Sequence, residues 1–225
     1  MHATTKLAAR PPIRPSGSVA KAPSRRSPKR DMLYLKIAVW CLALAPLGLL
    51  LYDALTGNLE AEPIKDVTHR TGWWTLTLLM VTLAITPLRH ITGWKQIVKL
   101  RRPIGLFASF YGTLHVLIYF GLDQLFAFDY ILEDIAKRPY ITLGFTAWLM
   151  LIPLTITSTK GWIRRLGKRW QKLHRLVYVV AVLGVVHFYW LVKADVREPL
   201  IFAAVLGVLL AFRLRWLKRF SAKTS

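Results

Sequence analysis

The chain has 225 residues, of which 54% are hydrophobic, and it carries a formal net charge of +21. This apolar share exceeds the roughly 45–50% of soluble domains, so composition excludes an ordinary soluble enzyme. The apolar residues also gather in blocks of membrane-spanning length, which leaves no room for a separate soluble catalytic domain. The only cysteine, Cys41, excludes an intrachain disulfide and a C-x-x-C-H site for covalent heme, and we expect it to be a small buried residue.

The N-terminal segment, residues 1–30, is rich in Pro, Ser, Ala and Arg and lacks an apolar stretch. It is predicted to be a disordered basic cytoplasmic tail, without a cleavable signal peptide. The membrane domain is expected over 31–217, followed by a short cytoplasmic tail, 218–225.

Six apolar segments predict an all-α integral membrane protein built as a six-transmembrane-helix bundle. The last segment is short but lengthens to Leu217 if Arg213 and Arg215 extend their charged ends to the interface. In chain order the segments are Ile37–Leu55, Gly72–Leu88, Ile104–Leu122, Tyr140–Ile156, Leu176–Val192 and Leu200–Phe212.

Charge predicts the orientation of these spans. If both termini are cytoplasmic, the inner segments hold 26 of the 32 Lys and Arg residues and one acid, Asp31. The outer segments then hold six bases and ten acids, as the positive-inside rule requires. The high charge therefore indicates loops that face anionic membrane lipid, not nucleic acid.

Two connecting segments have recognisable patterns. Residues 123–139 mix aromatic with acidic residues and predict a short helix on the membrane surface. The inner segment 160–175 is basic and amphipathic. No internal repeat, G-x-G-x-x-G fingerprint or Walker A sequence is evident, so a nicotinamide donor would have to be bound by another protein.

Two histidines lie at matching depth inside apolar segments. His115 lies 13 residues after Arg102 and His187 lies 12 residues after Arg175, which places both about 18–20 Å above the inner bases. Ionisable groups within membrane helices are rare and costly, and neutral imidazole is an axial ligand of heme iron. The pattern therefore favours one heme held between spans three and five; the alternative is a pair of hydrogen-bonded histidines that pack two helices.

Small residues precede both histidines. Gly112 and Gly184 each lie three residues earlier, where they would let a porphyrin approach the helix.

A third histidine, His174, lies at the inner interface, where it could ligate an inner heme or remain a solvated residue in a basic run. On an ideal helix His174 lies about 140° around the axis from His187, so the two histidines do not share one face of the helix. Two hemes would then require either a bend near Gly184 or an inner heme that approaches from a different side. Arg101 lies at the same level and could pair with heme propionates or be an interfacial anchor. His69 is too near the surface to match His115; it is an interfacial residue or a contact for propionate, quinone or a partner.

The chain resembles the ferric-reductase-type transmembrane domains of ferric reductases and NADPH oxidases. It is most similar to the MsrQ (YedZ) family, the heme-binding membrane subunit of the bacterial periplasmic protein-methionine-sulfoxide reductase system. The segments that carry this resemblance are Pro63–Gly72, Ile85–Leu88, Arg102–Leu106, Thr113–His115, Arg138–Gly144, Thr157–Thr159, Leu166–Tyr178 and His187–Lys193.

The resemblance implies that His115, His174 and His187 are axial ligands of heme iron. The wider oxidase pattern has a second histidine on span three, where this chain has Arg101 or Arg102. The resemblance thus leaves open one heme b or two, with Arg101 as a non-histidine partner of an inner heme.

The resemblance also implies a role in the bacterial inner membrane. The subunit would take electrons from the quinol pool or a cytoplasmic flavin reductase. It would pass them to a periplasmic molybdenum-containing reductase that repairs oxidised methionines, with FMN as a further cofactor. The alternatives are a self-contained ferric-chelate reductase, and a transporter or structural anchor with packing histidines.

Overall fold

The computed structural model describes residues 28–192 and 194–221, and all regular secondary structure in these residues is helical. All six predicted apolar segments lie almost entirely within helices. Five helical segments of the described residues are long and apolar enough to cross a membrane: Arg30–Thr56, Pro63–Thr92, Lys95–Asp123, Pro139–Ile156 and Lys168–Leu191.

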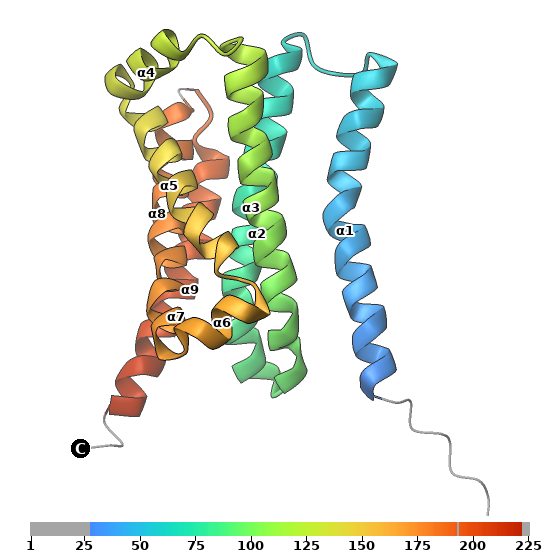
Figure 1. Ribbon diagram of the computed structural model, residues 1–225, viewed down its shortest axis with the longest axis vertical. Coiled ribbons are helices and arrows are strands. Elements are labelled where there is room, and N and C mark those ends of the chain that lie inside the picture. The colour runs from blue at the N-terminus through green and yellow to red at the C-terminus, as the bar shows by residue number, and fades with distance from the viewer. Residues whose placement is uncertain (1–27, 193, 222–225) are drawn as a thin grey trace, which may run out of the picture.

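Two antiparallel helix pairs form the centre of the bundle (Figure 1). The first pair is α2 (Pro63–Thr92) with α3 (Arg101–Ile118), and the second is α5 (Pro139–Ile156) with α8 (Leu176–Leu191). The C-terminal helix, α9 (Arg197–Ser221), packs against α2 and α8.

Local sequence explains several helix ends. Prolines open α2 and α5, where their missing N–H groups cost nothing. Gly93 ends α2 in the left-handed conformation (φ 71°), and its N–H bonds the Arg89 carbonyl. A 3₁₀ turn, η1 (Lys95–Leu100), leads into α3, and a π-helical turn, η2 (Tyr119–Asp123), extends it.

Short helices mark the two ends of the bundle (Figure 1). One end, which we call the α4 end, carries α4 (Phe128–Lys137). This helix confirms the one predicted within 123–139. At the other, the α6 end, α6 (Lys160–Leu166) and α7 (Lys168–Leu173) occupy the basic segment. The start of α1 and the end of α9 also lie toward the α6 end.

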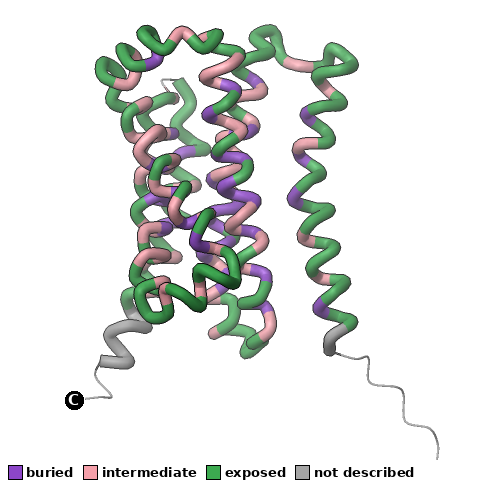
Figure 2. The backbone as a smooth tube through the Cα atoms, viewed as in Figure 1, coloured by how far each residue is buried: buried purple, intermediate pink, exposed green. Residues whose placement is uncertain are grey.

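The first helix, α1 (Pro28–Thr56), stands beside the bundle and is exposed over most of its surface (Figure 2). Cys41 lies on this exposed surface, so the prediction of a buried cysteine is wrong. Apolar residues such as Leu42 and Leu49 share this exposure because α1 buries only a narrow face against α2 and α3. A lipid-facing helix has this composition.

The predicted tails fall partly outside the structure. Residues 1–27 and 222–225 are outside the described residues, while α1 already begins at Pro28 and α9 continues to Ser221.

Candidate functional site

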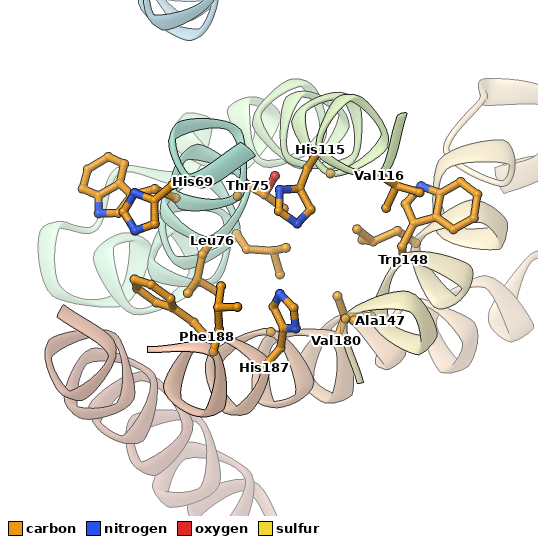
Figure 3. Close-up of a pocket in the computed structure, with 18 residues that line it drawn as sticks. His69, Thr75, Leu76, His115, Val116, Ala147, Trp148, Val180, His187 and Phe188 are labelled. Atoms are coloured by element: carbon orange, nitrogen blue, oxygen red, sulfur yellow. The ribbon is translucent and has the colours of Figure 1, made fainter. Parts of the chain in front are cut away.

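His115 and His187 meet between the two helix pairs. His115 lies on α3 and His187 on α8, and their ring centroids are 6.3 Å apart with planes at 83°. Figure 3 shows the two rings pointing toward one another from opposite walls of a cavity. The structure thus brings together the two histidines that the sequence places at matching depth.

Each imidazole is held by a backbone carbonyl of its partner helix. His115 Nδ1 lies 2.9 Å from the Thr68 carbonyl oxygen on α2, and His187 Nδ1 lies 2.6 Å from that of Tyr140 on α5. A carbonyl oxygen only accepts, so Nδ1 carries the proton in both rings. The lone pair of each ring is therefore on Nε2, where a metal can bind.

The cavity around the two histidines has two lobes, and His69, His115, Gly144 and His187 line both. The smaller lobe, about 100 Å³, is apolar, with Leu76, Leu79, Ala147, Trp148, Leu151 and Val180 among its lining residues. The larger lobe, about 750 Å³, extends to the α4 end and is lined in part by Lys65, Tyr119, Asp123, Asp134, Arg138 and Asp195. A cavity of this size is typical of small-molecule and cofactor sites, which span about 300–1,000 Å³.

Two polar clusters lie on the larger lobe. Asp134 pairs with Arg138 at 3.1 Å and accepts a hydrogen bond of 3.2 Å from the Tyr119 hydroxyl. Lys65 pairs with Glu62 at 3.2 Å. The lobe thus offers charged groups of both signs near the α4 end, while the walls beside the histidines are apolar.

His69 lies on the cavity wall, where it lines both lobes, and its ring centroid is 5.7 Å from that of Phe188. This histidine is exposed, as its predicted surface position implies. Gly112 and Gly184 line the smaller lobe.

His174 lies apart from this pair, between α7 and α8. Its ring stacks on Trp170 with centroids 3.9 Å apart, and its Nδ1 lies 3.2 Å from the Trp170 carbonyl oxygen. Its Nε2 lies 3.4 Å from the Ser158 hydroxyl. Arg101 is half-buried at the first position of α3, and neither residue is among those lining the two lobes described above.

A bend near Gly184 was one of two ways in which His174 and His187 could face the same stripe. The helix runs uninterrupted through Gly184 and instead breaks at His174 and Arg175, between α7 and α8. Because the turn at His174 and Arg175 lies between α7 and α8, the helical segment from Lys168 to Leu191 is not an ideal helix, and the angle expected on one does not apply to His174 and His187.

Sequence reasoning missed Gly72 and Gly144, which lie against the two imidazole rings. A Cβ atom at Gly72 would be 3.1 Å from His115 Nδ1, and one at Gly144 would be 2.8 Å from His187 Nδ1. The signal was present: both glycines precede their histidine by 43 residues.

Residues 71–185 match the family model described as ferric reductase like transmembrane component. This range contains His115 and His174 and ends two residues before His187. The chain is also similar to proteins named protein-methionine-sulfoxide reductase heme-binding subunit MsrQ. One from Xanthomonas axonopodis pv. citri (strain 306) is 47% identical over 199 residues, covering 86% of this chain and 90% of the relative. One from Herminiimonas arsenicoxydans is 48% identical over 189 residues, covering 83% and 87%.

Proposed function

The chain belongs to the MsrQ family of protein-methionine-sulfoxide reductase heme-binding subunits, and we propose that it carries electrons across a membrane on heme b bound by His115 and His187. The observation that carries this proposal is the facing pair of imidazoles with free Nε2 atoms.

The distance between the rings fits one iron atom. A ligating imidazole nitrogen lies about 2 Å from its metal, and the ring centre lies about 1 Å behind that nitrogen, so two axial rings have centres about 6 Å apart. The observed separation is 6.3 Å. The side chains of Leu76, Leu151 and Val180 beside the histidines are apolar, as the face of a porphyrin would require of its surroundings.

Heme b, when bound here, supplies one-electron chemistry between ferric and ferrous iron. The residues of the chain would bind and orient it: His115 and His187 would hold the iron through Nε2, and the carbonyls of Thr68 and Tyr140 keep the proton of each ring on Nδ1. The larger lobe also offers groups that could pair with propionates, with Lys65 and Arg138 as the cations and His69 as a ring that could donate a hydrogen bond.

For the membrane topology we propose six spans with both termini in the cytoplasm of the bacterial inner membrane. The concentration of Lys and Arg in segments of the α6 end supports this orientation. The sixth span would be α9, a helix of 25 residues. The α4 end would then face the periplasm, and the cavity of about 750 Å³ would extend to that side.

We propose as partner the periplasmic methionine-sulfoxide reductase subunit, a molybdenum enzyme by the family resemblance. The electron donor would be the quinol pool or a cytoplasmic flavin reductase, and the basic segment 160–175 would be the entry face for the latter. FMN is proposed on resemblance alone. A second, inner heme at His174 with Arg101 as neighbour is part of this proposal.

One measurement tests the function: the absorption spectrum of the purified protein, oxidised and reduced. We expect a reducible low-spin heme signal, and its absence would contradict the proposal in favour of an anchor with packing histidines. The rival ferric-chelate reductase is distinguished by activity. Reduction of a ferric chelate without any periplasmic subunit favours the rival, whereas electron delivery only to the partner supports the conduit.

A further inference from the structure

The two helix pairs repeat one another at a constant shift of 72 residues. Thr68 and Tyr140, Gly72 and Gly144, Gly112 and Gly184, and His115 and His187 are each 72 residues apart. No repeat was evident from the sequence, but the structure shows equivalent contacts in α2–α3 and in α5–α8. The repeat is recognised from these few positions because they make equivalent contacts with the two histidines. The residues between them make no such contacts and differ between the two helix pairs.

Each repeat holds its histidine in the same two ways. A carbonyl on the first helix accepts the Nδ1 proton, at 2.9 Å for His115 and 2.6 Å for His187. One helical turn further, a glycine faces the ring. A Cβ at Gly72 would lie 3.1 Å from both Nδ1 and Cε1 of His115, and one at Gly144 would lie 2.8 and 2.9 Å from those atoms of His187. Each ring thus occupies the space that a side chain would fill.

We propose that these carbonyl–glycine pairs are two equivalent clamps that position the heme ligands. Thr68 with Gly72 would fix His115, and Tyr140 with Gly144 would fix His187. In each clamp the carbonyl keeps the proton on Nδ1, and the glycine lets the ring lie directly against the neighbouring helix. Both Nε2 atoms would then face one iron. This inference rests on the proposed heme function and adds residues that do not themselves touch the iron.

The clamps should tune the heme as well as place it. A hydrogen bond from Nδ1–H to a carbonyl makes the imidazole a stronger donor, which favours ferric iron and lowers the reduction potential. The contacts at His187 are the tighter ones, because its hydrogen bond is shorter and a Cβ at Gly144 would come closer. Disturbing the α5 clamp should therefore have the larger effect.

Alanine substitutions test this ordering. Gly144→Ala and Gly72→Ala each add the single Cβ atom that would meet the ring. Gly207→Ala and Gly48→Ala are matched controls, since a Cβ at either position has nothing within 4 Å. Alanine favours the helix at all four sites, so the backbone itself is not penalised. The readouts on the purified full chain are heme content, the electron paramagnetic resonance spectrum and the midpoint potential.

We expect Gly144→Ala to lose the low-spin signal or to retain heme at least about tenfold more weakly, as is typical when an outer-shell partner of a metal ligand is lost. Gly72→Ala should keep its heme with a raised midpoint potential, and both controls should match the wild type. A Gly144→Ala protein that folds and matches Gly207→Ala in all three readouts would overturn the clamps.

If Gly144→Ala does not fold, Gly72→Ala decides: a raised potential supports the inference, and an unchanged potential and resonance spectrum overturn it. Failure of the heme function itself is distinguishable, because the wild type would then lack the heme signal.

Discussion

Tyr111 on α3 donates a hydrogen bond of 2.7 Å to the backbone carbonyl of Ala43 on α1. The same hydroxyl accepts a hydrogen bond of 3.1 Å from the Leu47 N–H, so it stands between two groups that an uninterrupted helix would pair with each other. Pro46 lies inside this turn, and a proline in a helix interior removes one backbone donor and clashes with the carbonyl four residues earlier. Tyr111 therefore pairs the backbone groups of the α1 turn that contains Pro46 and joins this exposed helix to the bundle.

Tyr111→Phe should loosen the attachment of α1. In a membrane the carbonyl and N–H that the hydroxyl serves find few other partners, so we expect a loss of about 1 kcal/mol, within the range for such interhelical bonds. Thermal unfolding in detergent measures this loss. Tyr52→Phe is the control, because Tyr52 is exposed on the same helix. Equal stability of the two variants would contradict the role given to the hydroxyl.

An ion pair network provides a second link between α1 and α2. Arg70 lies 2.5 Å from Asp53 on α1 and 2.8 Å from Asp66, whose side chain is only 4% exposed. Arg70→Met leaves this nearly buried carboxylate without its partner and should cost about 2 kcal/mol, less than a fully buried pair because Arg70 is partly solvated. Denaturant or thermal unfolding measures the cost.

Lys65→Met is the matched comparison for Arg70→Met. Lys65 pairs with Glu62 at 3.2 Å, but both side chains are more than two-thirds exposed. Its loss should change stability by less than about 0.5 kcal/mol. A cost at Lys65 as large as that at Arg70 would show that burial of Asp66 does not matter.

The sequence predicted the main elements and the histidine pair, and physical reasons explain this. Apolar blocks must be helical in a bilayer, because every backbone group has to be paired within its own segment. A helix rises by a fixed amount per residue, so counting from Arg102 and Arg175 placed His115 and His187 at the same depth.

What the sequence could not predict depends on contacts between helices. Whether α1 packs inside the bundle or beside it is decided by the few residues that it buries, so Cys41 was wrongly expected to be buried. The break at His174 carries no glycine or proline signal at that residue. The spacing of 43 residues between Gly144 and His187 is present in the sequence, but their contact follows only from the packing of α5 against α8.

The first prediction for the site concerns the facing histidines. His115→Ala and His187→Ala should each abolish the same low-spin heme signal, because a single iron would lose one axial ligand in either variant. Tyr189→Ala, an exposed neighbour of His187 on α8, should keep it. Spectra of the three purified variants give the answer. A full low-spin spectrum in either histidine variant contradicts the pairing.

The proposed topology predicts where a fused reporter functions. A reporter that functions only in the cytoplasm should be active when it is fused after Ser225, and one that functions only in the periplasm should be inactive there. The reason is that the basic segments keep this end of the bundle in the cytoplasm. A fusion after Gln124, at the α4 end, should give the opposite result. Activity of a periplasm-dependent reporter after Ser225 would contradict the six-span arrangement.

The last prediction concerns an inner heme at His174. Both ring nitrogens of His174 already have partners, the Trp170 carbonyl at 3.2 Å and the Ser158 hydroxyl at 3.4 Å. Ligation of iron through Nε2 must displace the long contact with Ser158, whereas the Nε2 atoms of the outer pair face an open cavity. With Arg101 in place of a second histidine, an inner heme should be held more weakly and be lost first in detergent.

His174→Ala should accordingly lower the heme content while the spectrum of the outer pair remains largely intact. Electron entry from the cytoplasmic side should slow sharply, because the remaining heme lies about 20 Å above the inner bases. Ser158→Ala is the informative companion, since it removes only the competing hydroxyl and should leave inner heme binding unchanged or stronger. Heme stoichiometry and reduction kinetics are the measurements. A wild type with one heme per chain, together with unchanged reduction in His174→Ala, would assign His174 to packing on Trp170 and leave the outer heme as the whole conduit.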